Sequence, residues 1–216
     1  MISLKNLTKY YRSIKGNQYI FKDVSFDIPN GFNIALLGSN GAGKSTLFRL
    51  LAGSEYPNKG KVVTELSLSW PVALSTGIHN KMTGRENARF IGRINGVVDL
   101  DKYVDRVVTF SELGIKFDLP VSTYSSGMRS RLAFACSLGI DFDVYLIDEV
   151  TAVGDQVFKD KAKSALLEKA SSANVIMVSH QLDELREFCN SAIVLHKGKL
   201  TFFDSLEDGI SEYESL

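Results

Sequence analysis

The residues with the clearest chemical potential form a glycine-rich loop near position 40. The loop consists of Gly38, Ser39, Asn40, Gly41, Ala42, Gly43, Lys44, Ser45 and Thr46. Glycines let successive backbone N–H groups curl around the β-phosphate of a triphosphate, while a following helix points its positive N-terminal end at the phosphates. Lys44 can then place an ammonium against the β- and γ-phosphates. The Ser45 hydroxyl is a natural Mg²⁺ ligand, and Thr46 can add a further phosphate contact.

The segments on either side of this loop are those that a phosphate loop requires. An apolar run at 35–37 is typical of a buried strand, and a second run, Leu47 to Leu51, is typical of an apolar helix. The alternative is a glycine-rich turn that only caps a helix. Because strand, loop and helix follow in the required order, the sequence favours a triphosphate site.

Two acidic residues, Asp148 and Glu149, directly follow the continuous apolar run 144–147. Such a run predicts a parallel strand buried on both faces, and ligands bind at the carboxyl ends of parallel strands. Asp148 could hold Mg²⁺ directly or through water, and Glu149 would then orient and polarise the attacking water. Two ordinary loop acids are the alternative, which the nearby phosphate loop disfavours.

His180 also follows a predicted strand, Asn174 to Val178. From there it could hydrogen-bond a γ-phosphate or a water molecule. A histidine at the end of a strand is more often structural, but His180 follows its strand as Asp148 follows the preceding one. We therefore keep His180 as a candidate catalytic residue.

A second set of small residues, Ser125, Ser126 and Gly127, lies at the start of an apolar helix, Leu132 to Leu138. Serine and glycine at a helix N-terminus make another cup for an anion. The loop around Lys44 already accommodates one triphosphate. The second cup therefore predicts a dimer, in which it faces the nucleotide of another copy.

The composition is that of an ordinary globular chain. Its 216 residues, 44% of them hydrophobic, fit one large domain or two small ones with a real core. The 25 basic residues balance the 25 acidic ones, which disfavours nucleic acid as a partner. Cys136 and Cys189 are expected to be buried free thiols, and no zinc spacing exists. Neither a signal peptide nor an apolar run of about 20 residues is recognisable.

The order of patterns predicts an α/β fold with one inserted helical part. Half-buried antiparallel strands are expected at Ile2 to Leu7 and Phe21 to Ile28, and short strands at 61–63 and 66–70. Helical patterns alone fill about 83–140, beginning with a capping box at Thr83 and Glu86. Alternation then returns, with helices at 155–171, 181–189 and 206–213 and strands at 174–178, 191–195 and 199–203.

In their order, these motifs resemble the ATP-binding subunits of ABC transporters, over the whole chain. The resemblance implies that the loop 38–46 is Walker A and that 144–149 is Walker B with catalytic Glu149. It also implies that Ser125 to Gly127 is the signature, that Asp155 belongs to the D-loop and that His180 is the switch histidine. For Tyr11 it implies stacking on adenine, whereas the strand pattern alone favours local packing.

The resemblance also implies a P-loop NTPase fold with a RecA-like mixed-sheet core and an antiparallel β subdomain. The chain would be a single ABC ATPase domain, 1–216, with its core at about 1–82 and 141–216 and a helical subdomain at about 83–140. Two copies would bind two ATP molecules and Mg²⁺ at their interface, and closure would drive integral-membrane permease subunits. The protein would lie peripherally on the cytoplasmic face of a bacterial inner membrane.

A narrower resemblance, to ABC-2 type exporters of capsular polysaccharide, is carried by four segments. These are Ser69-Trp70-Pro71, Thr83 to Asn87, Tyr124 to Met128 and Asp148 to Asp155. Exporters of teichoic acid and O-antigen are close alternatives. Some of these relatives carry an added carbohydrate-binding domain, and the chain's end at Leu216 favours the capsule type.

Two positions depart from the usual ABC pattern. The only glutamines are Gln18, Gln156 and Gln181, so none lies between Walker A and the helical subdomain, where most relatives place one. Ser126 replaces the first signature glycine.

The segment Trp70 to Met82 is the candidate docking surface for a permease. It would expose Val72, Leu74, Ile78 and Met82, although these residues could equally pack under the helical subdomain.

Two other classes of P-loop protein fit less well. A soluble ABC ATPase acting on nucleic acid or ribosomes usually needs a tandem domain or long insertions, which the chain lacks. A small-molecule P-loop kinase would need a phosphoacceptor pocket and lid but no segment such as Tyr124 to Arg129.

Overall fold

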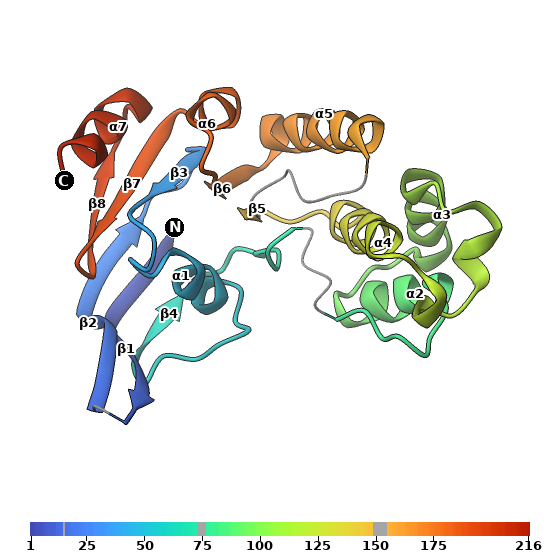
Figure 1. Ribbon diagram of the computed structural model, residues 1–216, viewed down its shortest axis with the longest axis horizontal. Helices are drawn as coiled ribbons and strands as arrows, with labels where there is room; N and C mark the ends of the chain where they lie inside the picture. Colours follow the sequence, from blue (N-terminus) through green and yellow to red (C-terminus); the bar gives the residue numbers. More distant parts are fainter. Residues whose placement is uncertain (15, 73–76, 149–154) are drawn as a thin grey trace. The chain divides into compact units, whose positions relative to one another are not determined.

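The computed structural model describes residues 1–14, 16–72, 77–148 and 155–216, which form two compact units (Figure 1). The first unit contains the described residues of 1–71, 142–149 and 170–216. The second contains those of 72–141 and 150–169. The second unit therefore includes more than the helical patterns at 83–140, because it also takes in most of a later helix.

An antiparallel sheet of three strands begins the first unit, in the order β2-β1-β4. Its strands are β1 (Ile2–Ser13), β2 (Gly16–Ile28) and β4 (Lys59–Val63). The first two are longer than their alternation predicts, because pairing continues to the hairpin end, where the rings of Tyr10 and Tyr19 lie 5.2 Å apart. Tyr11 consequently lies within β1 and not in a connection.

The second sheet of this unit has five strands in the order β5-β6-β3-β7-β8. They are β3 (Ile34–Leu37), β5 (Val144–Asp148), β6 (Asn174–Val178), β7 (Ser191–His196) and β8 (Lys199–Phe203). All neighbours are parallel except β7 and β8. The apolar runs predicted as central strands are buried on both faces, as parallel strands require.

Helices cover both faces of the five-stranded sheet. Helix α1 (Lys44–Leu51) and the three-stranded sheet share one hydrophobic core with the face that carries Leu36 and Leu146. On the other side, α7 (Leu206–Glu214) packs on β7 and β3, and α6 (Leu182–Phe188) packs on β6. Strand alternation therefore divides the apolar side chains between two layers.

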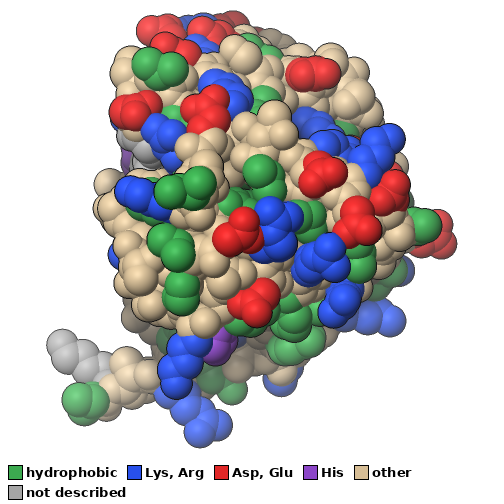
Figure 2. Space-filling view, turned by 90° about the vertical axis from the view of Figure 1, so that its right-hand side faces the viewer, with side chains coloured by type: hydrophobic (Ala, Val, Ile, Leu, Met, Phe, Trp, Pro, Cys, Tyr) green, Lys and Arg blue, Asp and Glu red, His purple; other side chains and the backbone are tan. Residues whose placement is uncertain are grey.

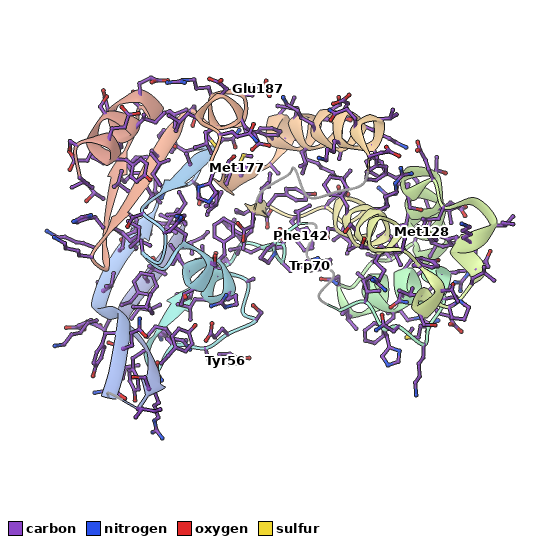
Figure 3. All side chains as sticks on the ribbon, in the orientation of Figure 1. Tyr56, Trp70, Met128, Phe142, Met177 and Glu187 are labelled. Carbon is purple, nitrogen blue, oxygen red and sulfur yellow. The ribbon has the colours of Figure 1, made fainter. Side chains whose placement is uncertain are left out.

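The strand expected at 66–70 is wrong. Only Leu68 forms a β-bridge, parallel to Val144, and the segment lies along the edge of β5. Ser69 is fully buried there, and its Oγ accepts a 2.9 Å hydrogen bond from the backbone N–H of Leu146. Trp70 then turns edge-on to Phe142, with ring centroids 5.5 Å apart (Figure 3).

The second unit is helical. It contains α2 (Gly84–Ile94), α3 (Leu100–Ser111), the short 3-10 helices η1 (Gly114–Asp118) and η2 (Val121–Thr123), α4 (Ser126–Leu138) and most of α5 (Gln156–Ser172). The predicted capping box is confirmed, because Thr83 and Glu86 exchange side chain to backbone hydrogen bonds of 3.1 and 2.8 Å. Phe110, Phe134 and Phe158 pack together where α3, α4 and α5 meet.

Both cysteines are buried free thiols, as predicted. Acidic and basic side chains are interspersed over the face drawn in Figure 2, in line with their equal numbers in the sequence. In the described part of the chain, no helix combines the length and apolar character needed to cross a bilayer.

We expect Ser69→Ala to lower the free energy of unfolding by about 1–3 kcal/mol, because it leaves the buried N–H of Leu146 without its acceptor. Urea denaturation measures this change. The matched control is Ser67→Ala, which removes an exposed hydroxyl paired with Asp143 and should cost about 1 kcal/mol or less, since water replaces it. Equal losses in the two variants would contradict the role of Ser69.

Candidate nucleotide site

The glycine-rich loop connects β3 to α1 and is packed too tightly for side chains at two points. A Cβ on Gly38 would lie 2.6 Å from the carbonyl oxygen of Leu195 in β7. Gly43, the N-cap of α1, has φ +112°, and a Cβ there would lie 2.5 Å from Cγ2 of Ile20. Glycine is required at both positions, so the loop backbone lies close to the sheet while the N-terminus of α1 points out of it.

Lys44 lies inside this loop. Its ammonium donates hydrogen bonds to the carbonyl oxygens of Gly38 and, at 3.2 Å, Ser39. Burial lowers the pKa of Lys44, whereas the carboxylate of Asp148 acts in the opposite direction. The structure therefore brings Lys44 and Asp148, which are far apart in the sequence, into one electrostatic environment.

The strand register explains why Asp148 and His180 share an edge of the sheet with the loop. Asp148 is opposite Val178 on the neighbouring parallel strand β6, and the exposed His180 follows two residues later. Ser179 fixes the intervening turn by donating to the buried carboxylate of Glu184 and accepting from the N–H of Gln181. Glu149, the predicted catalytic glutamate, lies outside the described residues.

The oxygen donors near the loop suit Mg²⁺. Ser45 is exposed in the first turn of α1, and the half-buried Asp148 ends β5. Among the described residues, no three His, Cys, Asp or Glu side chains form a metal cluster. Mg²⁺ usually takes only one or two protein carboxylates and fills its shell with water and substrate phosphates, so this donor set is adequate.

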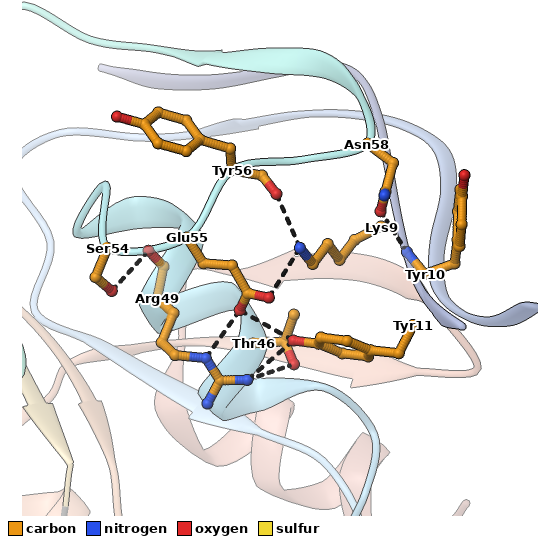
Figure 4. A network of polar contacts seen from close by, with 9 residues as sticks. All are labelled: Lys9, Tyr10, Tyr11, Thr46, Arg49, Ser54, Glu55, Tyr56 and Asn58. Atoms are coloured by element: carbon orange, nitrogen blue, oxygen red, sulfur yellow. Dashed lines mark hydrogen bonds and ion pairs between the residues drawn. The ribbon is translucent and has the colours of Figure 1, made fainter. Parts of the chain in front are cut away.

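Tyr11 is held beside α1 by a polar network that sequence reasoning missed (Figure 4). Its hydroxyl donates to Glu55 and accepts from Arg49 of α1, and 37% of its side chain is exposed. The local packing that the strand pattern favours is thus present, although Tyr11 is still partly exposed.

The signature residues lie at the N-terminus of α4, in the second unit. Ser125 is the N-cap, and its Oγ accepts from the N–H of Met128 at 3.3 Å. Ser125 and Ser126 are exposed. A Cβ on Gly127 would meet only the Oγ of Ser125, at 3.9 Å, so the described chain leaves nearly open space there.

Arg131, one turn after the signature, joins it to Asp155. Its guanidinium lies 2.7 Å from a carboxylate oxygen of Asp155, 3.8 Å from Glu112 and over the ring of Phe158. Asp155 also accepts the N–H of Phe158, at 3.0 Å, in the first turn of α5. These groups border a surface depression of about 400 Å³ that also reaches Ser125 and Gly127. No sequence pattern indicated a role for Arg131, because its contact with Asp155 joins residues that are 24 positions apart.

The candidate docking surface is only partly exposed. Val72 is 2% exposed, so for this residue the structure favours packing over exposure, the alternative left open by the sequence; burial in the apolar interior is favourable for a valine. Ile78 and Met82 are half-buried. Leu74 lies outside the described residues.

Comparison with known proteins identifies the class. Residues 21–152 match the family model for ABC transporters. The chain belongs to this family, whose ATP-binding subunits bind and hydrolyse ATP, and the expectation from its motifs is confirmed.

Several relatives are similar over nearly the whole chain. The polysialic acid transport ATP-binding protein KpsT of Escherichia coli is 45% identical over 99% of this chain and 96% of its own length. The capsule polysaccharide export ATP-binding protein CtrD of Neisseria meningitidis is 44% identical over 100% of both. The teichoic acids export ATP-binding protein TagH of Bacillus anthracis is 35% identical over 99% of this chain but 39% of its own length.

The fold is also that of solved ATP-binding cassettes. A dimeric, post-hydrolysis structure of the cassette MJ0796 bound to ADP and Pi superimposes with a TM-score of 0.76 at 22% identity, covering 95% of this chain and 99% of that one. The predicted α/β P-loop fold is thereby confirmed.

We expect Lys44→Ala to weaken ATP binding roughly 10- to 100-fold, the loss from hydrogen bonds to a charged group. Calorimetric titration of the purified chain measures this affinity. Lys59→Ala, which removes a lysine from β4, is the control and should bind as the unmodified chain does. Unchanged affinity in Lys44→Ala would contradict the assignment of the phosphate loop.

Proposed function

We propose that this chain is the ATP-hydrolysing motor subunit of an ABC exporter that moves capsular polysaccharide across a bacterial inner membrane. The near full-length similarity to CtrD and KpsT supports this substrate class. Teichoic acid is the alternative substrate, supported by the lower identity to TagH. In this proposal the protein lies on the cytoplasmic face of the membrane and works with permease subunits of the ABC-2 type.

Gly127 is the observation that supports a nucleotide site shared between two copies. Gly127 is the second residue of α4, and glycine has a lower helix propensity than alanine. Only the Oγ of Ser125, at 3.9 Å, approaches the place of its missing Cβ in the described chain. The reason for a residue without a side chain at this position therefore lies outside the described chain. A phosphate of a nucleotide on the other copy would approach Gly127, with the exposed Ser125 and Ser126 beside it.

Within one copy, the loop residues Gly38 to Thr46 would hold the phosphates and Tyr11 would stack on the adenine. Ser45 and Asp148 would hold Mg²⁺, which when bound neutralises charge that develops on the phosphates.

Glu149 would act as the base that takes a proton from the attacking water. His180, at the same edge of the sheet, would contact the γ-phosphate, and Asp155 would face the partner copy beside the signature.

The energy for movement would come from contacts made only when two copies close on ATP. A ligand shifts an equilibrium by its differential affinity for the two states. Phosphate contacts with Ser125 to Gly127 exist only in the closed dimer. Hydrolysis removes the γ-phosphate and with it those contacts, so the dimer reopens.

Mixing two inactive variants tests the shared site. A Lys44→Ala chain keeps an intact signature, and a Gly127→Asp chain keeps an intact phosphate loop. Each alone should hydrolyse little ATP, whereas an equal mixture should recover about a quarter of the unmodified rate, because half of the dimers carry one intact site of two. Steady-state phosphate release measures this recovery.

The control for this mixture pairs Gly127→Asp with a chain that carries both substitutions, in which no site is intact. It should stay inactive. Full activity of Gly127→Asp alone, or of a preparation that is monomeric at the assay concentration, would contradict the shared site.

Ile78 provides a test of the permease partner, since among the described residues it is the half-buried one nearest the centre of the segment Trp70 to Met82. A photo-crosslinking side chain at Ile78 should capture a co-expressed integral-membrane protein. The same group at Val98, which is fully exposed in the same unit, is the control and should not. Capture from Val98 but not from Ile78 would contradict this docking segment.

A further inference from the structure

The network around Tyr11 is more extensive than local packing of a strand residue requires (Figure 4). The Tyr11 hydroxyl donates to Oε2 of Glu55 at 2.9 Å and accepts from Nη2 of Arg49 at 3.1 Å. Nε of Arg49 donates to the same oxygen of Glu55, at 2.9 Å. Both hydrogen-bonding roles of the hydroxyl are therefore satisfied by two side chains that also bond to each other.

The same network reaches the phosphate loop. Nη2 of Arg49 also donates to Oγ1 of the buried Thr46, at 3.3 Å. Thr46 is the last residue of the glycine-rich loop and the third residue of α1. Arg49 thus fixes the position of Tyr11, from the three-stranded sheet, relative to the helix whose N-terminus faces the phosphates.

Lys9 supports the network at one face of the ring. It is only 7% exposed, and its ammonium contacts Oε1 of Glu55 and the carbonyl oxygen of Tyr56, both at 2.8 Å. The same ammonium lies 5.2 Å from the centre of the Tyr11 ring, within the range of a cation–π contact. The ring is therefore held at its hydroxyl and at one face, although 37% of the side chain is exposed.

Glu55 is the centre of this arrangement. Burial alone raises its pKa, but hydrogen bonds from Lys9, Arg49 and Tyr11 lower the pKa to about 2. The carboxylate therefore stays ionised at any pH at which the protein works. An isolated ion pair at a surface contributes little, whereas here three donors share one carboxylate and order a side chain that would otherwise rotate.

We propose that Glu55 and Arg49 are positioning residues for nucleotide binding, which hold the Tyr11 ring at a fixed place beside the phosphate loop for the base to stack on. This inference rests on the proposed role of Tyr11. Its physical basis is pre-organisation, because a ring that is already ordered loses less conformational freedom when the base binds. Glu55 contacts neither the phosphates nor Thr46 in this proposal, so its effect is confined to the base.

Three substitutions test the inference with little change in shape. Tyr11→Phe keeps the ring and the Arg49–Glu55 pair but loses both hydroxyl contacts, while Glu55→Gln and Arg49→Lys weaken the network from the other side. Each should raise the KM for ATP roughly 2- to 10-fold, the effect of one or two hydrogen bonds. The kcat should stay within about twofold of the unmodified value, because the contacts that differ between ground and transition state are unaltered.

Two further readouts separate positioning from general support of the fold. Inorganic triphosphate has phosphates but no base, so its inhibition constant should not change in Tyr11→Phe or Glu55→Gln, which leave the contact between Arg49 and Thr46 in place. The fluorescence of etheno-ATP falls when its ring stacks, so the three variants should quench it less than the unmodified chain does. When Tyr11→Phe is already present, adding Glu55→Gln should raise the KM for ATP little further, because the effects of residues that act through one contact are not additive.

The matched control is Arg85→Ala, which breaks an exposed Arg85–Asp118 pair of 2.7 Å in the second unit and should leave all three measurements unchanged.

The inference is overturned if Glu55→Gln and Tyr11→Phe leave the KM for ATP unchanged, or if they weaken the binding of inorganic triphosphate as much as the binding of ATP. Failure of the proposed base stacking itself gives a different result: Tyr11→Ala then binds ATP as tightly as the unmodified chain. If Glu55→Gln does not fold, Tyr11→Phe alone decides, because it leaves the half-buried carboxylate of Glu55 and its two cations in place.

Discussion

The close approach of the phosphate loop to strand β7 is the constraint on which the rest of the first unit depends. Gly38 packs so tightly against the carbonyl oxygen of Leu195 that no side chain fits between them. The loop can leave the sheet there only because β3 and β7 are parallel and in register, with Leu37 beside Val194. That geometry aims the N-terminus of α1 at the edge where Asp148 and His180 also lie, so the backbone itself creates the proposed phosphate-binding surface.

The chain carries two kinds of chemical group in two compact units. In the first, backbone donors, Lys44 and the acid that ends β5 are already assembled. In the second, Ser125 and Gly127 present small, exposed groups at a helix N-terminus, for which the described chain offers no internal reason. In the proposed dimer, such a division would let the first unit bind the nucleotide within one copy, while the second unit would add contacts only when another copy arrives.

The local parts of this structure could be predicted from the sequence because they depend on neighbours in the chain. The phosphate loop follows from its glycines and flanking apolar runs, the capping box follows from Thr83 and Glu86, and the buried strand β5 follows from its continuous apolar residues. The errors concern contacts across the fold. The segment at 66–70 alternates like a strand, yet it joins the edge of β5 through a single bridge at Leu68 and a few hydrogen bonds of Ser67 and Ser69. Tyr11 and Glu55 are 44 residues apart, and Arg131 and Asp155 are 24 apart, so no periodicity reveals either pair.

Arg131 also links the ends of three helices in the second unit. Its guanidinium lies between Glu112 at the end of α3 and Asp155 at the start of α5, and it covers the ring of Phe158, while its own helix begins with the signature. Three helix ends are thereby linked through one side chain, which couples the position of the signature helix to that of Asp155. In the proposed dimer, the signature and Asp155 would therefore meet the other copy as one coupled surface.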